Sequence, residues 1–543
     1  MIIPRVKSYK ETEKTWKYSG AFALTFENCP FSTDVEKALK LFLPDTKFCS
    51  CGCKLNFKGI DEKHPDEWYR FTVTEDVITA EFCDKRGAIN AAASITCLVL
   101  DGEAPCGIIE DHPDYSHRGV MIDLARSIRE PLQDVKDVIV YMAMSKMNRV
   151  HFHLMDSESI CFKSDSAPQI KGTKARNGRQ YTKEQLSEIV ELCDTFAIEA
   201  IPEIEVPAHA TALIEAFPQF ACDTDIENQS HWCICPTSDE VFELYENIIK
   251  EVCSIFHGKY LHVGGDELYF NDAPRLNMLC HWDVCRKCRA FREKKGLSGI
   301  QEQYYYVMKR IYDIVKSCGK TMVMWNDQID ISKESPIPKD VLIAFWRIAY
   351  PGRGPYENCT MEDFARQGYK LYNSIYEKTY VDLDEYLRED ELKSWSPVTY
   401  PEISDEFKQQ VVGSEMCAWE YGNRENYGFY DYTLKANIPM FADRLWDATP
   451  QEYDEDYRKE NYKMIFGKKL TKDLSPIFGG FLPPRSAKIM THVEHKDIDT
   501  DLIAAVIDEL SEIEANGHYS RQRYEYIKLL RDIAKLKYLA DNQ

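Results

Sequence analysis

Short apolar runs alternate with amphipathic stretches along most of the chain from residue 118 onward. Within the amphipathic stretches, apolar residues recur at every third or fourth position, which places them on one face of a helix. Strands separated by helices predict a parallel sheet built from βα units. The apolar runs cover residues 119–122, 149–153, 197–204, 260–263, 321–325, 341–346, 370–373 and 411–416, and the helical stretches include 132–145, 183–196, 241–256 and 301–316.

The apolar runs number eight, as a closed (β/α)8 TIM barrel requires. A doubly wound open sheet is the alternative, but no glycine-rich phosphate loop or Walker motif accompanies any run. Before the barrel the pattern is α+β, with strands expected at 21–26, 68–73 and 77–82 and a helix from Gly87. We therefore predict an α/β fold with a supporting α+β domain at 1–113, a (β/α)8 barrel at 114–455 and a helical segment at 456–543 that includes helices at 502–513 and 524–539.

Reactive side chains follow the predicted strands. In a (β/α)8 barrel the carboxyl ends of all strands meet at one face, so these side chains should share one cleft. They are Asp156 after the second run, Glu203, Glu205 and His209 at the third, Asp266 and Glu267 after the fourth, Trp325 and Asp327 at the fifth, Trp346 at the sixth, Tyr380 and Asp382 beyond the seventh, and Trp419 and Glu420 after the eighth.

The charge balance excludes several kinds of partner. The chain has 543 residues, with 67 Lys and Arg against 89 Asp and Glu, for a net charge of -22. Such a surface repels phosphate backbones and anionic lipid, so we expect neither a nucleic acid nor a membrane partner. The first ten residues lack the apolar region of a signal peptide, and we expect a cytoplasmic protein unless a leader has been trimmed. A homodimer surface on the C-terminal helices is a minor alternative to simple packing.

The cysteines suggest reduced thiols. There are 19 of them, an odd number that cannot all pair within the chain. Neither of two clusters has the spacing CxxC…CxxC, with two such pairs, that makes a zinc site easy to recognise. We therefore predict no metal and no cofactor, with metal binding at these clusters left open. The clusters are Cys49, Cys51 and Cys53, and separately Cys280, His281, Cys285 and Cys288.

The sequence His-Val-Gly-Gly-Asp-Glu at 262–267 is the strongest local signal. The glycine pair permits close packing or positive φ where a strand ends. Two carboxylates held close together cannot both ionise freely, so one pKa should rise and provide a proton donor. The alternative is a helix N-terminus, with Asp266 as the cap and Glu267 in the first turn.

Acids mixed with Trp and Tyr at one barrel mouth suggest a sugar site, because pyranose rings pack on aromatic rings while their hydroxyls bind carboxylates. Glycoside hydrolysis needs a proton donor, for which Glu267 is the candidate. Asp266 is a poor nucleophile partner, since adjacent residues rarely flank a bond at the ~5 Å separation of a retaining pair. In a substrate with a 2-acetamido group, the acetamide carbonyl can attack instead, while Asp266 orients and stabilises its N–H.

Several segments resemble glycoside hydrolase family 20, the exo-acting β-N-acetylhexosaminidases. The 262–267 stretch matches its H-x-G-G-D-E signature, and residues 118–126, 146–156 and 201–209 resemble its first three barrel strands. The resemblance implies retaining hydrolysis of terminal β-linked GlcNAc or GalNAc through an oxazolinium-type intermediate, with a glycan or glycoconjugate as partner. The eighth strand departs from the pattern, because Glu420 follows Trp419 directly where the family has Trp-x-Glu.

The resemblance also implies roles for the remaining residues. Tyr380 would hydrogen-bond the acetamide carbonyl, Asp382 would lie near the sugar, and Asp156 and His209 would support the proton donor. Arg118 would bind outer hydroxyls, as Glu420 does in the usual pattern, and the pocket walls would be Trp325, Trp346 and Trp419. Three alternatives stay open: a disaccharide-releasing enzyme like the lacto-N-biosidases, a carbohydrate-binding pseudoenzyme, and a cysteine-rich metal-dependent hydrolase that uses His262.

Overall fold

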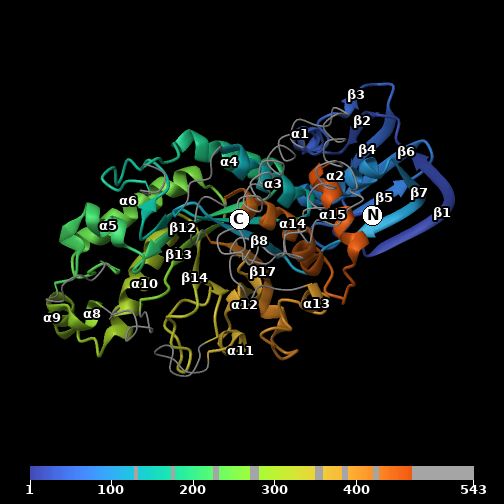
Figure 1. Cartoon of the computed structure of the whole chain (residues 1–543). Coiled ribbons are helices and arrows are strands. Elements are labelled where there is room, and N and C mark those ends of the chain that lie inside the picture. Colours follow the sequence, from blue (N-terminus) through green and yellow to red (C-terminus); the bar gives the residue numbers. More distant parts are fainter. Residues whose placement is uncertain are drawn as a thin grey trace, which may run out of the picture.

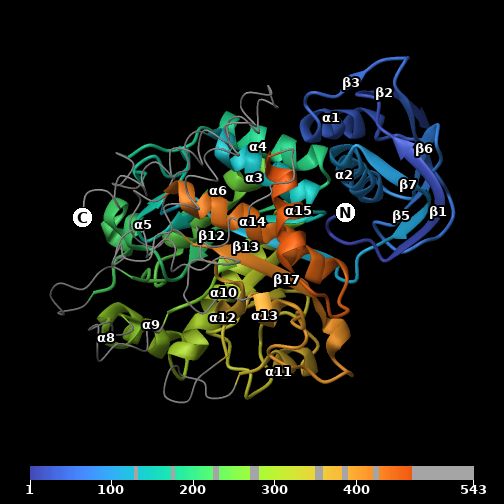
Figure 2. The same cartoon turned by 45° about the vertical axis from the view of Figure 1, so that its right-hand side comes forward.

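The computed structural model describes residues 1–126, 132–172, 178–223, 232–268, 281–348, 359–381, 389–419 and 427–466. An N-terminal sheet with its own helices lies beside a closed barrel, as Figures 1 and 2 show from two directions. Of the helical segment predicted at 456–543, the structure describes residues 456–466, which form all but the first residue of α15 (Glu455–Phe466). The helices expected at 502–513 and 524–539 lie outside the described residues.

The N-terminal part is a mixed sheet in the order β1-β7-β5-β6-β4-β2-β3. The three strands expected from the sequence are β2, β5 and β6, and the expected helix is α2 (Lys85–Asp101). A second helix, α1 (Ser32–Phe42), packs beside α2. The strands are β1 (Ser8–Lys17), β2 (Ala21–Glu27), β3 (Lys47–Phe48), β4 (Cys53–Gly59), β5 (Tyr69–Val73), β6 (Val77–Phe82) and β7 (Glu103–Asp111).

Helix α2 joins the sheet to the barrel. Asp84 caps its first turn by accepting a hydrogen bond from the Gly87 N–H at 2.7 Å, and Gly102 ends it with φ at 78°. The helix contacts β5, β6 and β7 on one side and α3 (Leu132–Met144) and α15 on the other. Because it is covered on both sides, nearly all of its residues are buried. Its sequence is correspondingly apolar around the whole circumference.

The barrel closes as eight parallel strands, which confirms the predicted (β/α)8 architecture. The closing pair is β17 with β8, where Ser414 lies opposite Arg118 and Ala418 opposite Ile122. This pairing excludes the open sheet. Each predicted apolar run forms one strand: β8 (His117–Asp123), β9 (Arg149–His153), β12 (Glu199–Val206), β13 (Tyr260–Gly264), β14 (Thr321–Trp325), β15 (Leu342–Phe345), β16 (Lys370–Asn373) and β17 (Val411–Ala418).

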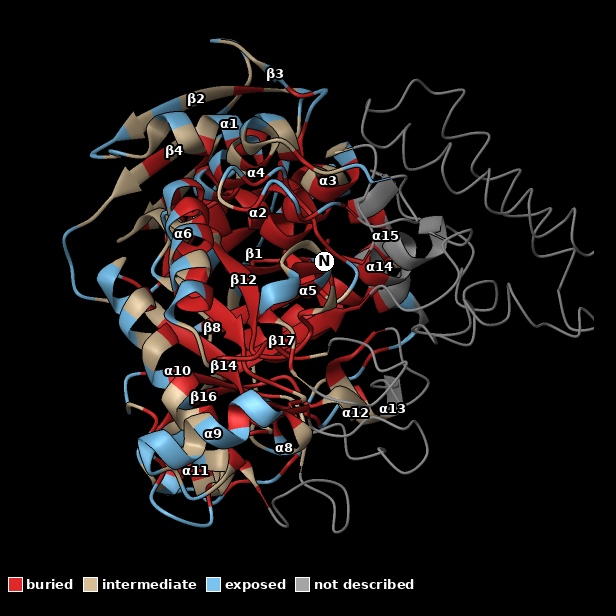
Figure 3. Ribbon diagram, turned by 90° about the vertical axis from the view of Figure 1, so that its left-hand side faces the viewer, coloured by how far each residue is buried: buried red, intermediate tan, exposed pale blue. Residues whose placement is uncertain are grey.

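The barrel strands are buried on both faces because helices cover the outside and side chains fill the inside. Figure 3 shows the strands as buried and the outer faces of α6 as exposed. The helices expected at 132–145, 183–196, 241–256 and 301–316 are α3, α4, α6 and α10. The longer covering helices are α4 (Lys183–Thr195), α6 (Asp239–Ile255), α10 (Ile300–Ser317) and α14 (Tyr427–Trp446).

Shorter elements occupy the connections. A small hairpin of β10 (Met155–Asp156) and β11 (Ser159–Ile160) follows β9.

Among the described helices, none is both long and apolar enough to cross a bilayer. The remaining elements are α5 (Thr211–Ala216), η2 (Pro218–Phe220), α8 (His281–Val284), α9 (Arg286–Lys295), α11 (Met361–Arg366), α12 (Tyr376–Thr379), α13 (Glu389–Leu392) and η3 (Lys408–Gln410).

Candidate active site

The glycine pair after β13 sets the position of the two carboxylates. Gly264 and Gly265 both have positive φ, at 63° and 88°. A Cβ on Gly264 would overlap a carboxylate oxygen of Glu205, so a larger residue would have to displace that side chain and also adopt a strained φ. The Tyr304 hydroxyl donates to the Gly265 carbonyl at 2.7 Å and holds the turn. The chain thus turns sharply at the carboxyl end of the strand and presents Asp266 and Glu267.

His209 links these carboxylates to Asp156. It follows β12 in the left-handed region, with φ at 51°. Its Nδ1 lies 3.3 Å from Asp156 Oδ1, and its Nε2 lies 3.2 Å from Glu267 Oε2 and 3.5 Å from Asp266 Oδ2. Burial opposes a charge on the ring, but the carboxylates of Asp156 and Asp266 outweigh it and hold the pKa of His209 well above its usual value. An imidazolium therefore lies among three carboxylates.

Asp156 is itself held by two cations. Arg126 Nη2 lies 2.6 Å from its Oδ2, and His153 Nε2 lies 2.8 Å from the same oxygen. Burial favours the neutral acid, but Arg126 and His209 outweigh it, so the pKa of Asp156 lies well below its usual value. Asp156 therefore remains ionised and fixes the orientation of the His209 ring.

A second buried cluster lies deeper in the barrel around Glu203. Its carboxylate binds His153, lies 2.7 Å from His262 Nδ1 and accepts the Trp325 indole N–H at 2.9 Å. His151 bridges it to the next carboxylate, 3.2 Å from Glu203 and 3.0 Å from Glu415. His262 thus has a carboxylate partner within the barrel core.

Aromatic rings form one wall beside the acids. Trp325, Tyr380 and Trp419 belong to one buried cluster, with ring centroids 6.1 Å apart for Trp325 and Trp419 and 5.7 Å apart for Tyr380 and Trp419. Trp346 is half-buried and stacks on Tyr380 at 6.2 Å. Four aromatic residues from different strand ends therefore meet, and Tyr380 and Trp346 contribute both a ring and a polar hydrogen to the wall.

Asp327, at the end of β14, connects the aromatic wall to the carboxylates. Its Oδ1 accepts the Trp346 indole N–H at 3.0 Å and its Oδ2 accepts the Glu267 backbone N–H at 3.0 Å. Trp232 holds the same turn from the other side, because its indole N–H donates to the Glu267 carbonyl at 2.8 Å and its ring lies 4.4 Å from that of His209. Sequence reasoning missed Trp232, which lies on a long connection with no periodic pattern.

The structure contradicts the role that we expected for Arg118. We expected it to bind sugar hydroxyls, but it lies at the start of β8, at the opposite end of the barrel. Its guanidinium is fully buried and paired with Glu67, and it also donates to the Tyr115 carbonyl at 2.7 Å. Arg126 follows the same strand at the correct end, 3.0 Å from Asp123 and over the Trp419 ring at 5.2 Å. An arginine that follows the strand, rather than one at its start, was therefore the residue that the sequence should have indicated for the site.

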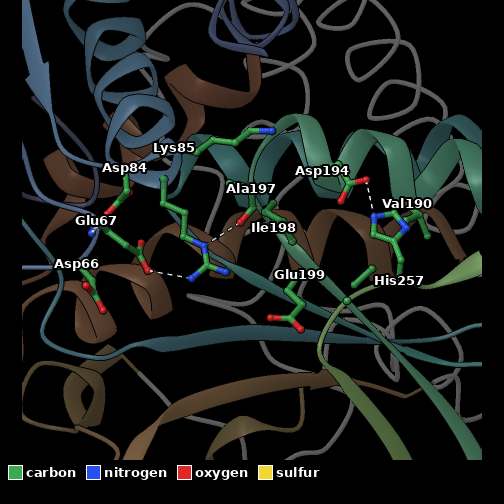
Figure 4. Close-up of a pocket in the computed structure, with 13 residues that line it drawn as sticks. Asp66, Glu67, Asp84, Lys85, Val190, Asp194, Ala197, Ile198, Glu199 and His257 are labelled. Carbon is green, nitrogen blue, oxygen red and sulfur yellow. Dashed lines mark hydrogen bonds and ion pairs between the residues drawn. The ribbon is translucent and has the colours of Figure 1, made fainter. Parts of the chain in front are cut away.

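A cavity of about 540 Å³ lies at the end of the barrel opposite the carboxylate pair, between the N-terminal sheet and the starts of β12 and β13. Figure 4 shows its charged walls. Arg86 Nη1 lies 3.7 Å from Glu67, its Nε donates to the Ala197 carbonyl at 3.0 Å, and His257 lies 2.8 Å from Asp194. No predicted site residue lines this cavity. Asp382 and Glu420 lie outside the described residues.

Four groups of described side chains have the composition and spacing of metal ligands. Three of them are the imidazole–carboxylate clusters around Glu203 and His209, in which imidazole nitrogens already lie 2.7 to 3.2 Å from carboxylate oxygens. The fourth contains only cysteines and lies away from the carboxylate pair. Of the cluster expected around residues 280–288, it includes Cys285 and Cys288.

The carboxyl ends of the strands thus carry adjacent acids, a carboxylate-held imidazole and an aromatic wall. These groups suit the hydrolysis of glycosidic bonds, because that reaction requires a proton donor, a stabilising charge and a surface for sugar rings. Residues 115–449 match the family described as glycosyl hydrolase family 20, catalytic domain. The chain belongs to this family.

Similar proteins agree with this assignment. A β-hexosaminidase of Akkermansia muciniphila is 31% identical over 279 residues, which cover 47% of this chain and 55% of that protein. One from Vibrio furnissii is 26% identical over 416 residues, covering 69% and 64%. The chain therefore spans between about half and two-thirds of these relatives. The solved β-N-acetylhexosaminidase of Bacteroides fragilis shares the fold, with a TM-score of 0.70, 21% identity and coverage of 85% and 94%.

Proposed function

We propose that the protein is a retaining exo-β-N-acetylhexosaminidase that removes terminal β-linked GlcNAc or GalNAc by substrate-assisted catalysis. Family membership supports glycosidase chemistry. The observation that carries the finer proposal is Asp266 Oδ1, a buried oxygen that has no hydrogen-bond partner among the described residues. A buried acceptor left unpaired is costly, so a ligand that donates a hydrogen bond would bind well there. The acetamido N–H of the sugar is such a donor.

In the proposed reaction, Asp266 accepts the acetamide N–H and stabilises positive charge on the nitrogen while the carbonyl oxygen attacks the anomeric carbon. Tyr380 donates its hydroxyl to that carbonyl. Glu267 protonates the leaving oxygen, then removes a proton from the water that opens the oxazolinium intermediate. Trp325, Trp346 and Trp419 surround the acetamido group and the sugar ring, and the Asp156–His209 pair maintains a positive charge beside Glu267.

Arg126 is the better candidate for binding outer hydroxyls. Its guanidinium lies at the carboxyl end of β8 and above the ring of Trp419, whereas Arg118 is enclosed by Glu67 at the other end. A planar guanidinium offers several donors in a fixed fork and so suits a pair of neighbouring hydroxyls.

The nucleophile is tested with a series of p-nitrophenyl β-glucosaminides whose acetyl groups carry none, one, two or three fluorine atoms. Fluorine withdraws electrons from the carbonyl oxygen, so kcat/KM should fall stepwise if that oxygen attacks. The corresponding β-glucoside, which lacks the acetamide, should be hydrolysed at a negligible rate. A rate that does not depend on fluorination would mean that an enzyme carboxylate attacks and would overturn the mechanism.

Glu267→Gln is the control that assigns the measured activity to this site. Loss of a general acid should lower kcat about 10²- to 10⁴-fold. The loss should be larger for a disaccharide than for p-nitrophenyl GlcNAc, because p-nitrophenolate leaves without protonation. Wild-type turnover in this variant would refute the role of Glu267. Binding without turnover by the wild-type chain would instead indicate a carbohydrate-binding pseudoenzyme.

A further inference from the structure

Four cysteines from three separate segments meet beside the barrel. All four are buried, and their sulfur atoms all lie within 4.8 Å of one another. None forms a disulfide. They belong to the connections that follow β12 and β13, which are the two strands that deliver His209 and the carboxylate pair. We call this group the thiol quartet; its members are Cys222, Cys235, Cys285 and Cys288.

The sulfur separations fit a single tetrahedral ion. Cys235 Sγ lies 3.8 Å from Cys285 Sγ and 3.7 Å from Cys288 Sγ. In a tetrahedral site with Zn–S bonds of about 2.3 Å, neighbouring sulfurs are about 3.8 Å apart. A disulfide would require about 2.05 Å. In an iron–sulfur cluster the four cysteines are divided among at least two iron atoms, so their sulfurs cannot all lie as close together as around one ion.

The local backbone also suits thiolate ligands. Cys285 is the N-cap of α9, and its sulfur accepts the Cys288 N–H at 3.4 Å and the Asp223 N–H at 3.2 Å. The spacing Cys-x-x-Cys at the start of a helix directs both sulfurs to one point. Backbone N–H groups and the positive end of the helix dipole both stabilise negative charge there.

We propose that the thiol quartet binds one Zn²⁺ ion in a closed structural site. Each thiol gives up its proton as it binds the ion, so the four protein ligands complete the tetrahedron and leave no position for substrate or water. The site therefore takes no part in the hydrolysis itself.

The ion would hold the segment that supports Glu267. Cys235 follows Trp232 by three residues, and between them the Ile234 carbonyl accepts the Trp282 indole N–H at 2.7 Å. Trp232 in turn donates to the Glu267 carbonyl at 2.8 Å. The Zn²⁺ ion would thus tie the connection after β12 to that after β13 and fix Trp232 against the turn of the carboxylate pair.

Metal content of the full chain tests the site directly. The protein is expressed with zinc in the medium, purified under reducing conditions and analysed by mass spectrometry of the elements. We expect about one zinc per chain in the wild type and a loss of at least tenfold in Cys285→Ala. Two matched controls, Cys51→Ala in the exposed N-terminal cluster and Cys193→Ala in the core, should keep about one zinc. Zinc retained by Cys285→Ala, or lost equally in the controls, would overturn the proposal.

X-ray absorption at the zinc edge of the wild-type protein tests the ligand set without any variant that must fold. Four sulfur neighbours at about 2.3 Å are expected. Cys233 lies two residues before Cys235, and the His281 carbonyl accepts the Cys285 N–H at 2.9 Å, so both residues lie next to the quartet. A nitrogen ligand would show that His281 binds the ion and would overturn the four-cysteine assignment, as would a wild-type chain that takes up no zinc. Both measurements are independent of glycosidase activity, so they stand or fall separately from the proposed function.

Discussion

Asp266 and Glu267 are adjacent in sequence but lie in different surroundings. The side chain of Asp266 is 12% exposed and that of Glu267 is 21% exposed. Burial raises the pKa of Asp266 to about 6, although the neighbouring His209 opposes the shift. The raised pKa therefore belongs to the carboxyl proposed to bind the acetamide and not to the proposed proton donor, contrary to the expectation from the sequence, and its main cause is lost hydration rather than repulsion within the pair.

This pKa predicts the acid side of the pH profile. In the proposed mechanism only ionised Asp266 stabilises positive charge on the acetamide nitrogen, so kcat/KM for p-nitrophenyl GlcNAc should fall about tenfold per pH unit below pH 6. The measurement is a pH–rate profile of the wild type beside Asp266→Asn. The Asn variant should be severely impaired and should lose this acid limb, since its amide does not titrate. Full wild-type activity maintained down to pH 4.5 would contradict the role of Asp266.

Strand β8 shows how an element decides the role of its residues. Arg118 is the second residue of this strand and Arg126 lies three residues beyond its end. A rise of about 3.3 Å per residue carries the chain roughly 16 Å along the barrel between Arg118 and Asp123. Arg118 therefore faces the N-terminal sheet, where it pairs with Glu67, and Arg126 faces the candidate active site. Although burial favours the neutral form of Glu67, Arg118 outweighs it and lowers the pKa of that carboxyl.

Replacing Arg118 should therefore affect stability rather than catalysis. Arg118→Met leaves the buried Glu67 without its closest cation, which should lower the free energy of unfolding by about 3–5 kcal/mol. Below the unfolding temperature, KM and kcat should remain near wild type. Denaturant unfolding and kinetics on the same sample measure both effects.

The double variant Arg118→Met with Glu67→Gln is the control, because it removes both charges together. It should recover part of the lost stability. A several-fold rise in KM with unchanged unfolding would instead place Arg118 in sugar binding.

At the scale of the whole molecule, alternating imidazoles and carboxylates extend through the barrel from Glu415 to Asp156. Burial opposes charge on the two central histidines, but Glu415 and Glu203 outweigh it and raise the pKa of His151 to about 9, and Glu203 and Asp156 raise that of His153 to about 10. Burial also opposes charge on Glu415, but His151 outweighs it and lowers the pKa of Glu415 to about 2. The core of the barrel therefore holds a network of alternating negative and positive charges.

This network predicts how stability depends on pH. The folded chain holds the histidine protons more tightly than the unfolded chain, where histidine titrates near pH 6.5. Their contribution is complete below pH 6.5 and falls by about 1.4 kcal/mol per pH unit for each histidine as the pH rises toward 9 to 10. The Glu415 contribution is present above about pH 4.5 and is lost as the pH falls toward 2. Unfolding temperatures should therefore be highest near pH 5 to 6.5.

Thermal unfolding measured from pH 4 to 10 checks this expectation. His151→Asn should show a shallower decline between pH 6.5 and 9 than the wild type, even where it is less stable throughout. Stability that stays constant or rises across that interval in the wild type would show that these histidines are neutral in the folded protein.

The periodicity of the chain was sufficient to predict the eight barrel strands and four of the covering helices. A strand buried on both faces has a continuous apolar run, and a helix buried on one face has apolar residues at every third or fourth position. Strand ends then predicted which side chains meet, since parallel strands of a closed barrel share one carboxyl end. The predicted role of Arg118 in sugar binding was wrong because the role was assigned by matching residue types to a motif, without asking which end of the strand each residue occupies.

Long-range contacts have no such trace in the residue pattern. The thiol quartet joins cysteines separated by up to 66 positions in the chain, and Trp232 reaches Glu267 from a connection without periodicity. The pKa of Asp266 likewise depends on burial and on His209, which lies far away in sequence. Hydrophobic periodicity alone therefore specified the eight barrel strands, four of their covering helices and the order of these elements. The packing of the connections decided which charges, rings and thiols lie within bonding distance, because those energies depend on separation in space rather than along the chain.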